Sequence, residues 1–205
     1  MIKSTIEFIT SIQKDLKNWD PRTKPWFRGE SGSEAPLCPK IAKYTAEQEN
    51  HFVQSFWRKA GGLANTPHRN ETDMWLFLAQ HYGVPTRLLD WTEGALLGLY
   101  FAINRRNPNP KVYMLNPYRL NELAMGISSD YLNYPLSWGK NKPGYENIAL
   151  AWEHRNPERG FLLPVAIPAT YQDHRMIAQR SCFTVHGQSL PRMGSKDGVR
   201  SILLA

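Results

Sequence analysis

The chain has 205 residues, of which 41% are apolar and 21% charged, and this length can bury a substantial core without a disulfide framework. Its two cysteines, Cys38 and Cys182, lack the paired spacing of a zinc ribbon, so we expect reduced thiols in a cytoplasmic protein. The Lys and Arg residues behind the net charge of +7 are scattered, which leaves a polyanionic partner open without requiring one.

Hydrophobic periodicity predicts helices over residues 4–19, 45–60, 71–83 and 93–105. The first two begin with a capping-box pattern, at Ser4 and at Thr45. The last is apolar on every side, so we expect protein to surround it. Its apolar run is about half of the ~20 residues that cross a bilayer, so we expect no membrane anchor.

Short runs rich in aromatic and β-branched residues predict strands over residues 25–29, 111–115, 161–167 and 182–187. Residues 125–160 are polar and interrupted by Gly and Pro, which predicts a long irregular segment. We therefore predict a single α+β domain over residues 1–205, with N-terminal helices around a small, mostly antiparallel sheet.

The stretch QHYGVPTRLLDW, from Gln80 to Trp91, carries a dense group of polar residues between two apolar segments. Arg87 and Asp90 are three residues apart in what reads as a tight turn, so they could pair with each other. Under this structural interpretation, Gln80 and His81 cap the preceding helix. The second interpretation is that the group forms the floor of a binding site, and the sequence leaves both open.

Three motifs, in chain order, are WFRGE, LAQHYGVPTRLLDWTEGALLGLYFA and RMIAQRSCFTV. Together they resemble the FRG domain, a family of bacteria and phages named for a triplet that is Phe27, Arg28 and Gly29 here. The resemblance covers about residues 5–188 and implies a defence-associated protein. The chain ends soon after the third motif, so we expect one part of a larger effector or a shortened version of it.

The triplet is also similar, more faintly, to the start of the R-S-E group of ADP-ribosyltransferases. That similarity implies that Arg28 holds the diphosphate of NAD, and that Thr86 and Arg87 fall at the Ser/Thr position. Where the group has a catalytic glutamate, the best candidate before the late strand CFTV is Gln179 here. Gln179 can hydrogen-bond a ribose hydroxyl but offers no negative charge to an oxocarbenium ion.

The chemistry of the triplet agrees with a phosphate site. An arginine fork binds phosphate oxygens through charge-assisted hydrogen bonds, and Gly29 would let a bulky ligand approach the backbone. The structural alternative for Arg28 is an ion pair with Glu30 or Asp90.

The two resemblances imply an ADP-ribosyltransferase-like pocket for a nucleotide such as NAD. Its expected catalytic residues are Arg28, His81 and Gln179. Its expected ligand-binding residues are Arg28, Gly29, Gln80, His81, Tyr82, Thr86, Arg87 and Asp90. The competing hypothesis is a non-catalytic module that binds protein or nucleic acid, which the net charge, the seven tryptophans and residues 125–160 favour.

Other chemistries have weaker signals. The six histidines show neither HxxxH nor CxxC ligand spacing, so we predict no metal site. Cys182 and His186 share one face of a predicted strand but lie too far apart for direct contact. A packed thiol and a hydrogen-bonded histidine are therefore favoured over a catalytic pair.

Overall fold

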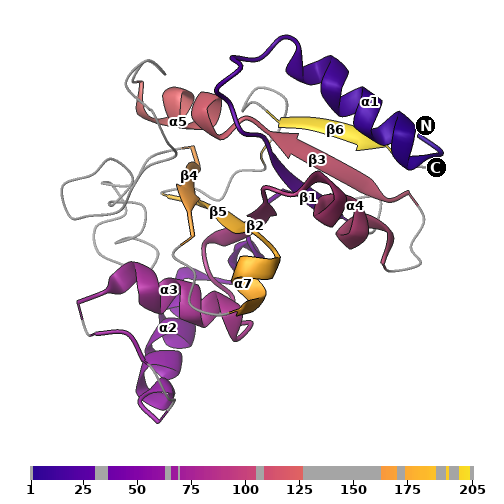
Figure 1. Cartoon of the computed structure of the whole chain (residues 1–205). Coiled ribbons are helices and arrows are strands. Elements are labelled where there is room, and N and C mark those ends of the chain that lie inside the picture. Colours follow the sequence, from indigo (N-terminus) through magenta and orange to yellow (C-terminus); the bar gives the residue numbers. More distant parts are fainter. Residues whose placement is uncertain are drawn as a thin grey trace.

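The computed structural model describes residues 2–30, 37–62, 66–68, 70–104, 109–126, 163–169, 174–187, 193 and 199–203. Its centre is an antiparallel sheet of six strands in the order β4-β5-β2-β1-β3-β6 (Figure 1). The strands are β1 Trp26–Glu30, β2 Leu88–Thr92, β3 Lys111–Leu115, β4 Val165–Pro168, β5 Ser181–Val185 and β6 Val199–Leu203. With the helices below, this sheet confirms the predicted α+β class.

The helices are α1 Thr5–Leu16, the short 3-10 helix η1 Lys40–Lys43, α2 Ala46–Ala60, α3 Thr72–His81, α4 Ala95–Ile103, α5 Pro117–Met125 and α7 His174–Ala178. The predicted capping box at Thr45 is complete, because Gln48 and Thr45 each bond the other's backbone N–H. At Ser4 only one half forms, since the Glu7 carboxylate accepts from Lys3 instead. Within the described ranges, no helix has the length and apolarity needed to cross a membrane.

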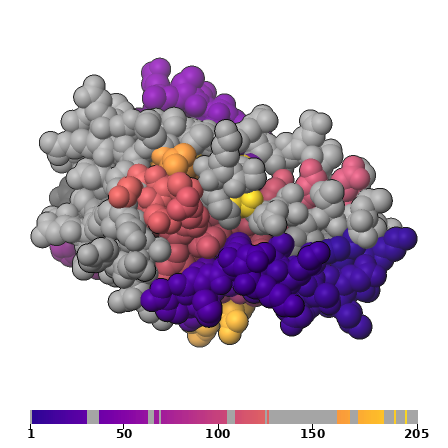
Figure 2. Space-filling view, turned by 90° about the horizontal axis from the view of Figure 1, so that it is seen from above, coloured from indigo at the N-terminus to yellow at the C-terminus, as the bar shows by residue number. Residues whose placement is uncertain are grey.

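One face of the sheet is covered by two groups of helices. Helices α1 and α4 pack on β1 and β3, where Phe8, Phe27 and Ala102 share a buried cluster. Helices α3 and α7 pack on β2, β4 and β5, where Phe77 and Phe183 stack. The opposite face packs against α5 through Leu120. Seen from above, the indigo N-terminal region and the salmon region that contains α5 lie next to each other (Figure 2).

Helix α4 approaches β1 through two glycines. A Cβ built on Gly29 would overlap the Gly98 carbonyl oxygen and the Ala102 nitrogen of α4, and one on Gly98 would lie 2.8 Å from the Phe27 Cβ. Helix α4 thus occupies the space that a side chain at position 29 would need. The triplet's glycine, expected to make room for a ligand, makes room for α4.

The expectation that protein surrounds α4 is wrong. Leu96, Tyr100 and Ile103 are each more than half exposed, at 56%, 53% and 55%. They share one outward side at four- and three-residue spacing, while Gly98 and Ala102 face the sheet. A uniformly apolar sequence carries no periodic signal, so it could not indicate which side is buried.

Several elements differ from the predictions. The stretch treated as a turn before Trp91 is strand β2, and η1, α5, α7 and β6 were not predicted. The strand predicted over 161–167 is β4, which begins at Val165. The irregular segment predicted over 125–160 lies outside the described residues from position 127 onward.

Candidate functional site

The sheet opens between β1 and β2. These two strands share one register pair, Phe27 opposite Thr92, whereas each other neighbouring pair of strands shares four or five. If the pairing continued, Gly29 would lie opposite Asp90. Instead, Arg28 Nη1 donates to the Asp90 carbonyl oxygen at 2.7 Å. The guanidinium therefore supplies the donor that the opened ladder no longer provides.

A pocket of about 660 Å³ lies at this opening, lined by α4 on one side and by α3 and α7 on the other. Six residues that the sequence predicted for a site line it: Arg28, Gly29, Gln80, His81, Asp90 and Gln179. They come from β1, α3, β2 and the residue after α7, which are far apart in the chain. The topology thus brings the three sequence motifs to one cavity.

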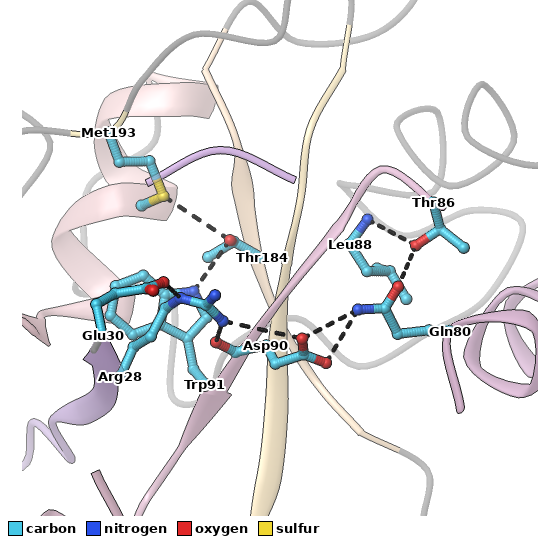
Figure 3. A network of polar contacts seen from close by, with 9 residues as sticks. All are labelled: Arg28, Glu30, Gln80, Thr86, Leu88, Asp90, Trp91, Thr184 and Met193. Atoms are coloured by element: carbon cyan, nitrogen blue, oxygen red, sulfur yellow. Dashed lines mark hydrogen bonds and ion pairs between the residues drawn. The ribbon is translucent and has the colours of Figure 1, made fainter. Parts of the chain in front are cut away.

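Arg28 is held between two acidic residues (Figure 3). Its Nε donates to Glu30 Oε1 at 2.6 Å, and its Nη1 lies 3.8 Å from Asp90 Oδ2. The Arg28 and Glu30 side chains are 21% and 16% exposed. Burial, and then the Glu30 carboxylate, raise the pKa of Tyr113, which lies opposite Arg28 in the sheet. Arg28 therefore forms the ion pair with Glu30 that the structural interpretation expected, and it also lines the pocket.

A chain of hydrogen bonds fixes Gln80. The Leu88 backbone N–H donates to Thr86 Oγ1 at 3.1 Å, and the Thr86 hydroxyl donates to Gln80 Oε1 at 2.7 Å. Gln80 Nε2 then donates to both carboxylate oxygens of Asp90, at 3.0 and 3.1 Å (Figure 3). Thr86 is 2% exposed and does not line the pocket, so it acts on the site through Gln80.

Gln179 is held at the pocket by its backbone. Thr92, at the end of β2, donates its hydroxyl to the Gln179 carbonyl oxygen at 2.6 Å. The same hydroxyl accepts the Gly94 N–H at 3.1 Å. Thr92 also lines the pocket, although the sequence interpretation did not single it out.

The predicted pair of Arg87 with Asp90 is wrong. Residues 88–92 form a strand rather than a turn, and side chains three positions apart point to opposite faces of a strand. Arg87 instead binds Glu49 of α2 through two parallel hydrogen bonds of 2.6 and 2.8 Å, and it also donates to the Gly187 carbonyl. Both side chains are buried, at 11% and 4% exposure. Arg87 therefore joins α2 to the sheet away from the pocket.

Two other predicted site residues have different surroundings. Tyr82 is 56% exposed, and its ring lies against Phe56 outside the pocket. His81, at the end of α3, is exposed and does line the pocket.

Residues 23–111 match the FRG domain family. The chain contains an FRG domain. No curated protein and no solved structure matches the chain. The matched residues of the FRG domain include Arg28, Gln80 and Asp90, whereas Gln179 lies beyond them. Most of the pocket lining therefore belongs to the matched FRG segment, and the C-terminal part of the chain adds Arg175, Met176, Gln179, Ser181 and Phe183.

Sequence reasoning missed several polar residues that line this pocket: Glu30, Lys40, Thr92, Asn104, Arg175 and Ser181. Glu30 completes the first motif, Thr92 directly follows the polar stretch, and Arg175 begins the third motif, so these had a local signal. Lys40 lies in η1, far from any motif of the FRG domain, and only the fold brings it to the pocket.

Cys182 and His186 are buried side chains of the core. Burial raises the pKa of the Cys182 thiol, so it stays a packed, protonated thiol. Among the residues that the structure describes, neither ring nitrogen of His186 has a hydrogen-bond partner, so the expectation of a hydrogen-bonded histidine is wrong. Burial, and then the Arg87 charge, lower the pKa of His186 from 6.5 to about 3.

Because the pKa of His186 is lowered, we expect the free energy of unfolding to fall in acid. Because the folded pKa of about 3 lies below the unfolded value of 6.5, the unfolded chain binds the proton first as the pH falls. The contribution of neutral His186 to the free energy of unfolding is fully present above about pH 7. About 2 kcal/mol of it is lost by about pH 5. Denaturant unfolding of the parent and of His186→Phe at both pH values measures it. Equal losses in the two proteins would contradict the assignment to His186.

Proposed function

We propose that this FRG-domain chain binds a nucleotide such as NAD in the pocket at the β1–β2 opening, as an ADP-ribosyltransferase-like site. The supporting observation is that three separate positions line one cavity: Arg28 on the first strand, Thr92 on a later strand, and Gln179 just before a late strand. These are the kinds of position that the R-S-E resemblance names. We assign the Ser/Thr position to Thr92 in place of Thr86, because Thr86 is 2% exposed and does not line the pocket.

The lining suits a ligand that combines phosphate with aromatic and sugar groups. Arg28, Lys40 and Arg175 supply positive charge, and guanidinium groups favour phosphate oxygens. Phe77, Phe101, Phe183 and other aromatic side chains line the same space and supply apolar faces for a base. The volume of about 660 Å³ lies within the usual range for small-molecule pockets.

We propose nucleotide binding at this pocket, and transfer of an ADP-ribosyl group would need a carboxylate in addition. Gln179 can donate to or accept from a ribose hydroxyl, but it cannot stabilise a developing positive charge as a carboxylate does. Glu30 and Asp90 are the carboxylates among the described pocket residues. Transfer of an ADP-ribosyl group would therefore depend on one of these two, with His81 available as a proton carrier.

Calorimetric titration of NAD, ADP-ribose and ATP tests the proposal. Arg28→Ala is expected to weaken nucleotide binding by about 1.5–3 kcal/mol through loss of charge-assisted hydrogen bonds. The matched control is Arg119→Ala, which removes an arginine from an exposed pair with Glu122 on α5 and should leave affinity unchanged. Absence of binding by all three nucleotides at millimolar concentration would refute the proposal.

We also propose that the protein acts in the cytoplasm, as an effector in bacterial defence against phage or in phage counter-defence. The FRG resemblance supports this role, and the free thiols of Cys38 and Cys182 fit a reducing compartment. The alternative is a non-catalytic module for protein or nucleic acid, which the net charge of +7 favours. Gel-shift titrations of DNA and RNA over a salt series separate the two, because salt-sensitive binding to either favours the module.

A further inference from the structure

Asp90 is an exposed carboxylate in the middle of an interior strand. Its neighbours in β2, Leu89 and Trp91, are each 3% exposed, while its own side chain is 57% exposed. Strand β2 lies between β5 and β1, so a central side chain would ordinarily be covered. The opening between β1 and β2 instead exposes Asp90 to the pocket that it lines.

The surrounding hydrogen bonds hold this carboxylate in one orientation. Thr86 Oγ1 accepts from the Leu88 N–H, so its own proton goes to Gln80 Oε1. This assigns the Gln80 amide nitrogen to the side that faces Asp90, where it contacts both carboxylate oxygens. Asp90 is therefore positioned by a neutral amide that is itself fixed from behind.

The carboxylate keeps acceptor capacity for a ligand. An ionised carboxylate offers about four acceptor positions on its two oxygens. Among the described residues, Gln80 is the hydrogen-bond donor to these oxygens, since Arg28 Nη1 lies 3.8 Å away. Two adjacent acceptor oxygens match two adjacent hydroxyl donors.

The charges around Asp90 restrict the class of donor. Arg28, Lys40 and Arg175 line the same pocket, and Glu30, its other described carboxylate, is paired with Arg28. Because the charges of Lys40 and Arg175 then outweigh that of Asp90, the lining disfavours a cationic donor group. Neutral hydroxyls next to a phosphate satisfy both the carboxylate and the cations, and a ribose of a nucleotide carries such a pair. We propose that Asp90 binds the vicinal hydroxyls of a ribose, so that the pocket selects ribonucleotides over 2′-deoxyribonucleotides. This inference rests on the nucleotide function proposed above.

Calorimetry with ADP-ribose and its two 2′-deoxy analogues, each lacking the hydroxyl on one ribose, tests the inference. In the parent protein, one of the analogues is expected to bind about 10-fold more weakly than ADP-ribose. In Asp90→Asn this ratio should fall below about 3-fold, because one acceptor is replaced by a donor. Since the side chain is 57% exposed, the variant should melt close to the parent.

A second pair of variants tests the positioning by Thr86. Thr86→Val removes the hydroxyl that fixes Gln80 and should reduce the difference in affinity between ADP-ribose and the weaker analogue. Thr86→Ser keeps the hydroxyl and should retain this difference. If ADP-ribose binds but neither analogue is weaker, or Asp90→Asn discriminates as well as the parent, the inference on Asp90 is overturned alone. If NAD, ADP-ribose and ATP all fail to bind, the proposed function is overturned together with it.

Discussion

Replacing Glu49 with alanine is expected to destabilise the chain by about 3–5 kcal/mol, because it leaves the buried Arg87 guanidinium without its carboxylate. The pair is bidentate, with distances of 2.6 and 2.8 Å, and both side chains are almost fully buried. Without Glu49, the folded state contains an unpaired buried charge on Arg87, which lowers the free energy of unfolding. The hydrogen bond from Arg87 to the Gly187 carbonyl offsets only part of this loss. Urea denaturation of the parent and of Glu49→Ala measures the difference.

The matched control is the exposed pair of Arg119 with Glu122, which also has a 2.6 Å contact. Its side chains are 52% and 28% exposed, so Glu122→Ala should cost no more than about 1 kcal/mol. A cost for Glu49→Ala as small as that of the control would show that the Glu49–Arg87 pair does not stabilise the fold.

Gly29→Ala is expected to cost about 3 kcal/mol, because the added methyl group has no space between β1 and α4. The atoms it would overlap are backbone atoms, the Gly98 carbonyl oxygen and the Ala102 nitrogen, which cannot move by a change of rotamer. Relief therefore requires α4 to shift away from the sheet. Thermal melting monitored by circular dichroism should show a large drop in melting temperature.

Gly61→Ala provides the control for this prediction. Gly61 follows α2 at a φ of −58°, and nothing lies within 4 Å of a Cβ built there. Alanine at this position should therefore be neutral or slightly stabilising. If Gly29→Ala melts like Gly61→Ala, the close packing of α4 on β1 does not explain the glycine of the triplet.

Local signals in the sequence predicted most of the N-terminal helices. The pattern at Thr45 marked the start of α2. The helix predicted over 71–83 is α3, which ends at His81, two residues before Gly83 with its φ of 78°. Strand β2 was missed because LLDWT interrupts its apolar run with Asp90 and follows a Gly and a Pro. Asp90 is exposed where the strand opens onto a pocket, which a local pattern cannot indicate.

Contacts between distant residues could not be read from spacing. Arg87 was paired with its nearest acidic neighbour, whereas its partner Glu49 lies 38 residues away on α2. Likewise, the motifs indicated Arg28 and Gln179 separately, and the order of strands in the sheet brings them to one cavity. The family match confirms the FRG prediction over residues 23–111.

A crystal structure of the protein with ADP-ribose would show whether the opening between β1 and β2 is a nucleotide site. We expect ligand density in the pocket, with a diphosphate near Arg28 and a ribose whose hydroxyls contact Asp90. Density for ADP-ribose at another place, or an empty pocket in crystals soaked at saturating concentration, would contradict it.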